Sequence, residues 1–149
     1  ANLSAVKFKW EAGFLNSAYY KLEHIAHFHL GDLATSIQKV KLSEYANEAM
    51  VYSTTMGSIG ALLPITHKED LEFFVHLEMY MRQESLPLLG RDHLAFRSAI
   101  APVKNVVDGD LCEGFPKLSF DLQNVLAEQL EHRPTEILKR LEEFRNCIL

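Results

Sequence analysis

The chain has few of the residues that build reactive, metal-binding or membrane-spanning sites. Cys112 and Cys147 are the only cysteines, and they stand 35 positions apart. This spacing supplies neither a zinc knuckle nor a CxxC redox pair, and it favours a reducing compartment such as the cytosol or nucleus. Apolar runs such as residues 59–65 are interrupted by Gly60 and Pro64. They are far shorter than the ~20 residues needed to cross a bilayer, so no membrane protein is indicated.

Basic charge is also scarce. The net charge of the 149 residues is −5. Residues 1–65 contain five lysines and five acidic residues, so residues 66–149 carry the whole acidic excess. Binding to nucleic acid would require a basic stripe to neutralise phosphates, and the sequence contains none. We therefore expect no direct contact with nucleic acid from this segment.

Catalytic motifs are missing as well, because the sequence contains no GxSxG, P-loop or HExxH pattern. His24, His27 and His29 resemble a metal site, but on a strand His24 would point away from the other two. Asp108 and Asp110 flank Gly109, and aspartates in such turns usually bond the local backbone rather than act as an acid/base pair. The sequence predicts no enzyme, no cofactor and no metal.

Short strand-like segments fill residues 1–65. They are Val6 to Trp10, Tyr20 to Leu30, Thr35 to Leu42, Ala49 to Thr55 and Ser58 to Ile65. Gly31-Asp32 and Met56-Gly57 provide turns, so the segments predict a β meander. In the second segment Leu22, Ala26, Phe28 and Leu30 are expected on one face.

Four or five strands correspond to roughly one to one and a half propeller blades at ~40–45 residues each. A single blade cannot bury its two faces without neighbours. The strands therefore predict a fragment, or the end, of a longer polypeptide.

Helical periodicity replaces the strand pattern after Ile65. Thr66 and Glu69 have the spacing of a capping box, and Leu71, Phe74, Leu77 and Met81 form an apolar stripe that continues to about Glu84, before Pro87 and Gly90.

Further elements are predicted as follows: a short helix over Arg91 to Ser98, an extended segment over Ala101 to Val107, a turn at Asp108-Gly109-Asp110 with Gly109 at positive φ, and helices at Ser119 to Leu130 and Thr135 to Ile148. In the first of these last two helices Leu122, Val125, Leu126 and Leu130 are expected to face the core, and in the second Ile137, Leu141, Phe144 and Ile148. The chain is thus predicted to be α+β, with strands in 1–65 and a helical domain in 66–149.

Five side chains are of the types that anchor protein interfaces. Phe73, Phe74, Tyr80, Arg91 and Arg97 are therefore candidate partner contacts. The alternative is that the aromatic stripe is a core face that seals the helices onto the strands.

Residues 87–115 resemble the C-terminal signature of the large β-propeller subunits of splicing factor 3b. The matching stretches are Gly90-Arg91-Asp92-His93-Leu94, Phe96-Arg97-Ser98, Pro102 to Val106, and Asp108-Gly109-Asp110-Leu111-Cys112-Glu113. Upstream, Trp10 to Asn16, Phe28 to Asp32, Ser36 to Lys39 and Tyr52 to Gly60 are also similar, as is the segment from His67. The similarity loosens after Phe115.

The resemblance implies the final blade strands and the C-terminal helical domain of a nuclear chain with three propellers. It implies a scaffold for pre-mRNA splicing and branch-site recognition in the U2 snRNP. Its expected partners are the HEAT-repeat subunit and the small helical subunit of splicing factor 3b, together with the remainder of its own propeller chain. The alternatives from the same superfamily are a cullin ubiquitin ligase adaptor and a pre-mRNA cleavage and polyadenylation subunit.

Overall fold

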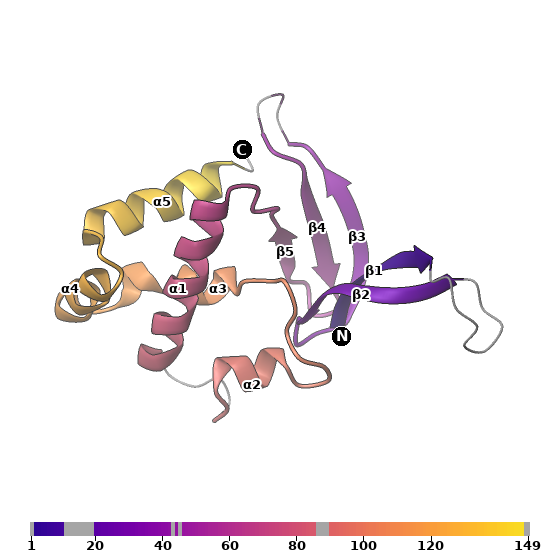
Figure 1. Ribbon diagram of the computed structural model, residues 1–149, viewed down its shortest axis with the longest axis horizontal. Coiled ribbons are helices and arrows are strands. Elements are labelled where there is room, and N and C mark those ends of the chain that lie inside the picture. The colour runs from indigo at the N-terminus through magenta and orange to yellow at the C-terminus, as the bar shows by residue number, and fades with distance from the viewer. Residues whose placement is uncertain (1, 11–19, 43, 45, 86–89, 148–149) are drawn as a thin grey trace. The chain divides into compact units, whose positions relative to one another are not determined.

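A computed structural model describes residues 2–10, 20–42, 44, 46–85 and 90–147 (Figure 1). The fold combines antiparallel strands with helices, as the sequence predicted. Two compact units are present, and each is discontinuous in sequence. Unit 1 contains residues 1–33 and 88–106, and unit 2 contains residues 34–87 and 107–149. The predicted boundary between residues 65 and 66 concerns the domains of a longer chain and stays a prediction.

Unit 1 is built on an antiparallel pair of strands. They are β1 (Asn2–Trp10) and β2 (Tyr20–His29). The register shifts between Ala5 and Val6, which pair with Ala26 and His24, so that Ile25 is left as the extra residue of a bulge. The bulge interrupts the period-2 alternation. The predicted common face is therefore wrong in part, since Phe28 is buried whereas Leu22 is exposed.

Unit 2 begins with a three-stranded antiparallel sheet of order β3-β4-β5. Its strands are β3 (Ala34–Val40), β4 (Ala49–Thr54) and β5 (Ile59–Leu62). Gly57 lies at φ +85°, and its amide donates to the Thr54 carbonyl at 3.1 Å, which confirms the predicted Met56-Gly57 hairpin. The single meander is wrong, because the five described strands form two separate sheets and the turn at Gly31-Asp32 joins strands that do not pair.

The remaining regular elements of the described residues are helices. They are α1 (Lys68–Glu84) in unit 2, α2 (His93–Arg97) in unit 1, and then α3 (Gly109–Cys112), η1 (Phe115–Lys117), α4 (Phe120–Gln129) and α5 (Pro134–Asn146) in unit 2. The predicted capping box of Thr66 and Glu69 is wrong, since His67 occupies the N-cap without a side-chain bond. The helix was predicted to continue to about Glu84, and α1 ends at Glu84 with Ser85 as its C-cap, which confirms this end; Pro87 lies outside the described residues.

The predicted turn at Asp108 is instead the start of a helix. The carboxylate of Asp108 accepts a hydrogen bond from the amide of Leu111 at 3.3 Å and so caps α3. Gly109 is the first residue of α3 and is not among the residues at positive φ, so that prediction is wrong. An aspartate followed by glycine fits an N-cap as well as a turn, and the sequence pattern alone does not distinguish the two.

The helices of unit 2 share one hydrophobic core. Its buried members are Phe73, Phe74, Leu77, Met81, Leu111, Cys112, Phe115, Leu126, Ala127, Ile137 and Leu141. Two predicted core positions are wrong, because Leu71 and Val125 are exposed. Both lie on helix faces directed away from this core. The predicted position of Ile148 lies outside the described residues.

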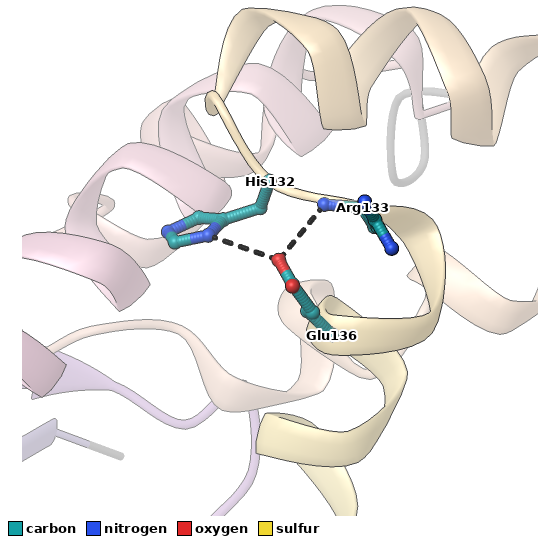
Figure 2. Close-up of polar contacts among 3 residues, drawn as sticks. All are labelled: His132, Arg133 and Glu136. Carbon is teal, nitrogen blue, oxygen red and sulfur yellow. Dashed lines mark hydrogen bonds and ion pairs between the residues drawn. The ribbon is translucent and has the colours of Figure 1, made fainter.

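The start of α5 is stabilised by polar contacts that the sequence analysis did not predict. The amide of Arg133 donates to the Glu136 carboxylate at 3.1 Å, and Nδ1 of His132 lies 3.5 Å from the same oxygen (Figure 2). The backbone bond, followed by the contact with His132, lowers the pKa of Glu136. The carboxylate thus satisfies an amide that has no partner within the helix.

In the part of the chain that the structure describes, we find no helix with the length and apolar character needed to cross a membrane.

Candidate interaction surfaces

The signature residues of α2 pack onto the end of β2 within unit 1. The guanidinium of Arg97 lies 4.5 Å from the centre of the Phe28 ring, and its Nη1 donates to the His29 carbonyl at 3.1 Å. Phe96 makes an edge-to-face contact with His29, with ring centres 5.4 Å apart. Arg97 is only 8% exposed, so its charge is stabilised by these contacts rather than by solvent. Two separate signature stretches, Phe28 to Asp32 and Phe96 to Ser98, are therefore in direct contact.

The second signature segment of unit 1 covers the outer edge of β2. Lys104 and His27 exchange two backbone hydrogen bonds, each 3.0 Å long. The ammonium of Lys104 donates to the His24 carbonyl at 2.6 Å. The Asn105 side chain donates to the carbonyl of Ile25, the bulge residue, at 2.8 Å. We call Phe96, Arg97, Lys104 and Asn105 together the β2 clasp.

The clasp covers backbone groups along one edge of β2. An open strand edge presents unpaired backbone groups that recruit other strands. Lys104 pairs with that edge and Asn105 bonds the bulge carbonyl. Asn105 itself lies at φ 52°, a conformation that asparagine tolerates better than most residues. The extended segment predicted over Ala101 to Val107 is present only as an isolated bridge at Lys104.

The candidate partner contacts are divided between the two units. Phe73 and Phe74 are buried in the core of unit 2, and Tyr80 is partly buried against it. Arg91 is exposed and Arg97 belongs to the clasp, both in unit 1. Whether any of the five contacts a partner stays a prediction. Their placement assigns a structural role to Phe73, Phe74 and Arg97 and leaves Arg91 accessible.

The histidine and aspartate candidates are also separated. His24 is exposed whereas His27 is buried. Among the described residues no group of three or more histidine, cysteine or acidic side chains is arranged to hold a metal ion. Asp108 is buried at its capping position, and Asp110 is exposed.

Two further features were missed by sequence reasoning. Nδ1 of His27 is buried without a hydrogen-bond partner among the described residues. A hollow of about 270 Å³ lies among the helices of unit 2 and is lined by Glu69, Glu72, Phe73, His76, Leu130, His132 and Arg140. Its lining mixes carboxylates with a guanidinium and imidazoles, and this mixture selects no single ligand charge. No sequence motif marks either feature.

The thiol of Cys112 is unsuited to nucleophilic chemistry. It is buried in the core of unit 2, with its sulfur 3.9 Å from the Phe74 carbonyl. Burial, followed by the nearby carboxylates of Glu78 and Asp108, raises the pKa of this thiol far above its usual range. The thiolate is the reactive form of cysteine, so a raised pKa and burial both make Cys112 inert.

The fold defines a class of protein, a mixed chain of helices and antiparallel strands, in which the side chains of Arg97, Lys104 and Asn105 bond the chain's own backbone. Comparison with known sequences identifies the family of the chain. A family described as the CPSF A subunit region matches residues 2–117, and the chain belongs to this family.

Relatives of the chain carry names from pre-mRNA splicing. Spliceosome-associated protein 130 A of Arabidopsis thaliana is 54% identical over 143 residues, which are 96% of this chain and 12% of that protein. Probable splicing factor 3B subunit 3 of Dictyostelium discoideum is 49% identical over 143 residues, 96% of this chain and 11% of that protein. Pre-mRNA-splicing factor prp12 of Schizosaccharomyces pombe is 45% identical over 135 residues, 91% of this chain and 11% of that protein. The chain thus spans about an eighth or less of the length of these relatives.

Proposed function

We propose that this chain is part of a structural subunit of splicing factor 3b, which supports pre-mRNA splicing and branch-site recognition in the U2 snRNP through protein–protein assembly. The observation that carries the proposal is the 54% identity to a spliceosome-associated protein over 96% of the chain. A catalytic role has less support, since the described groups with shifted pKa are Glu48, Cys112 and Glu136, at ion-pair, core and capping positions, and His29, which packs against the Phe96 ring. The site of action is the nucleus.

The parent chain has three β-propellers, with residues 1–65 as terminal blade strands and residues 66–149 as a helical domain. Exposed apolar residues on the β3-β4-β5 sheet support this architecture. Ile37, Met50 and Ile59 are all exposed, although a sheet normally buries at least one face. Blade strands receive such cover from neighbouring blades. The expected partners are the HEAT-repeat and small helical subunits, with no direct contact to nucleic acid and none to membrane.

A truncation of the full-length parent tests this function. Removal of residues 66–149 should abolish copurification of the tagged parent with the HEAT-repeat and small helical subunits. Met56→Ala is the matched control, because this side chain is 83% exposed on the hairpin of unit 2 and should leave assembly intact. Normal assembly of the truncated parent would contradict the proposal. Copurification with a cullin in place of the splicing subunits would instead favour the ubiquitin ligase adaptor.

A further inference from the structure

One dipeptide in unit 2 has the chemistry to rearrange its own backbone without an enzyme. Asp108 precedes Gly109, and no other aspartate or asparagine in the sequence precedes a glycine. In such a pair the side-chain carboxyl group can react with the amide nitrogen of the next residue, because glycine has no side chain to hinder the approach. The fold determines whether the two groups can react.

The structure holds Asp108 in an arrangement that blocks this reaction. The residue is only 2% exposed. Its carboxylate accepts a hydrogen bond from the Leu111 amide at 3.3 Å, and its carbonyl accepts one from the Cys112 amide at 3.2 Å. To bring Cγ of Asp108 onto the Gly109 nitrogen, the side chain and the peptide between them must rotate. Such a rotation gives up both hydrogen bonds.

We propose that Asp108–Gly109 is a latent isomerisation site, which α3 keeps inactive and which reacts when α3 opens. The Gly109 nitrogen then forms a bond to Cγ of Asp108. The carboxyl hydroxyl leaves and takes the amide proton with it as water, so that a succinimide ring remains. Water next adds to either ring carbonyl. Cleavage of the new bond restores aspartate, whereas cleavage of the bond to the former backbone carbonyl gives isoaspartate, and neither route consumes an oxidant, a reductant or a cofactor.

The isoaspartate product cannot rebuild the cap of α3. The chain now runs through the former side chain, so the backbone gains one methylene group and the carboxylate that accepted from the Leu111 amide becomes part of the main chain. α3 supplies Leu111 and Cys112 to the core of unit 2. An opening that is reversible before the reaction is therefore permanent after it. This inference does not depend on the proposed function, and cover from the rest of a longer chain would only bury Asp108 further.

Isoaspartate can be measured directly in the full-length parent. The tagged chain is incubated at physiological temperature, either native or denatured in guanidinium chloride, and digested with trypsin. The peptide Asn105–Lys117 is analysed by electron-transfer fragmentation, which distinguishes isoaspartate from aspartate. Asp110 lies in the same peptide before a leucine and is the internal control. We expect isoaspartate at Asp108 to form at least about tenfold faster in the denatured chain, since the rate follows the population of the open form.

Two variants separate the chemistry from its protection by the fold. Gly109→Ala hinders the attacking nitrogen, while an added Cβ meets no atom outside its neighbours within 4 Å. The fold should therefore be kept, and the rate in the denatured chain should fall at least about tenfold, equivalent to ~1.4 kcal/mol of barrier. Leu111→Ala leaves the reacting pair unchanged but removes a buried side chain of α3, so the native chain should react at least about tenfold faster. If this variant unfolds, its rate should equal that of the denatured unsubstituted chain.

The inference would be overturned by equal rates in the native and denatured chains, by isoaspartate as abundant at Asp110 as at Asp108, or by rates that the two variants leave unchanged. Limited proteolysis of the incubated native chain tests the permanence of the opening. Protease should cleave the isoaspartate form before the unmodified form. Equal cleavage of the two forms would show that α3 closes again after the reaction.

Discussion

Replacing Gly31 by alanine should weaken the β2 clasp for two separable reasons. Gly31 lies at φ +87°, where an alanine is strained by roughly 1–2 kcal/mol. An added Cβ would also lie 2.7 Å from Cζ of Phe96, closer than real contacts allow. Displacing a packed ring in this way costs about 1–3 kcal/mol. We therefore expect Gly31→Ala to destabilise unit 1 by about 2–5 kcal/mol.

Gly90 provides a matched control in the same unit. It lies at φ +73°, and a Cβ there would meet no atom within 4 Å, so Gly90→Ala should cost only the roughly 1–2 kcal/mol of backbone strain. The difference between the two variants isolates the Phe96 contact. That difference should largely disappear when both are made in a Phe96→Ala background, because the ring that the new methyl group meets is then absent.

Hydrogen exchange of the His27 and Lys104 amides measures the effect, since each donates to the other residue's carbonyl across the clasp. With a factor of ten for each 1.4 kcal/mol, Gly31→Ala should accelerate exchange roughly 30- to 4,000-fold and Gly90→Ala roughly 5- to 30-fold. Amides of α1, in unit 2, serve as the internal reference. The reasoning would be refuted if Gly31→Ala and Gly90→Ala accelerated exchange of these amides equally. It would also be refuted if Gly31→Ala still caused faster exchange than Gly90→Ala in the Phe96→Ala background.

Three further outcomes are expected. Gly60→Ala should destabilise the β4-β5 pairing by about 1–3 kcal/mol, because the new methyl group would collide with the Tyr52 ring; unchanged exchange of the hairpin amides would contradict this. A thiol reagent should label the partly exposed Cys147 in the native chain and Cys112 only after unfolding; equal rates for both would show that the core is open. Burial, aided by the nearby Arg97, lowers the pKa of His29 below 6.5, so the folded state binds fewer protons than the unfolded state and unit 1 should lose stability as pH falls below about 6.5. His29→Gln should remove that pH dependence of exchange, measured after correction for intrinsic rates.

Local pattern was sufficient to predict most elements of the fold. The stripe of Phe74, Leu77 and Met81 predicted α1, and Ser119 predicted the start of α4, where its side chain accepts from the Leu122 amide at 3.5 Å. The hairpin at Gly57 was also predicted from adjacent residues, because glycine tolerates the positive φ that the turn requires. These features depend on neighbours within a few positions, which the sequence displays directly.

Features that depend on distant partners could not be predicted in this way. The bulge at Ile25 is bonded by Asn105, 80 positions away, and no local signal marks it. The exposure of Leu71 and Val125 follows from which side of each helix meets the others, and a window of sequence does not determine this. The resemblance to the splicing factor 3b subunits identified Phe96, Arg97, Lys104 and Asn105 as signature residues. Only the structure shows that these residues contact β2.

The pairing of Lys104 with His27 also has a consequence for synthesis of the chain. Lys104 follows His27 by 77 residues. At ~5–20 residues per second, the ribosome therefore synthesises Lys104 roughly 4–15 s after the β2 edge with which it pairs. During that interval β2 offers unpaired backbone groups to any nearby strand. The speed of translation through residues 30–106 therefore determines how long the nascent chain is exposed to incorrect pairing.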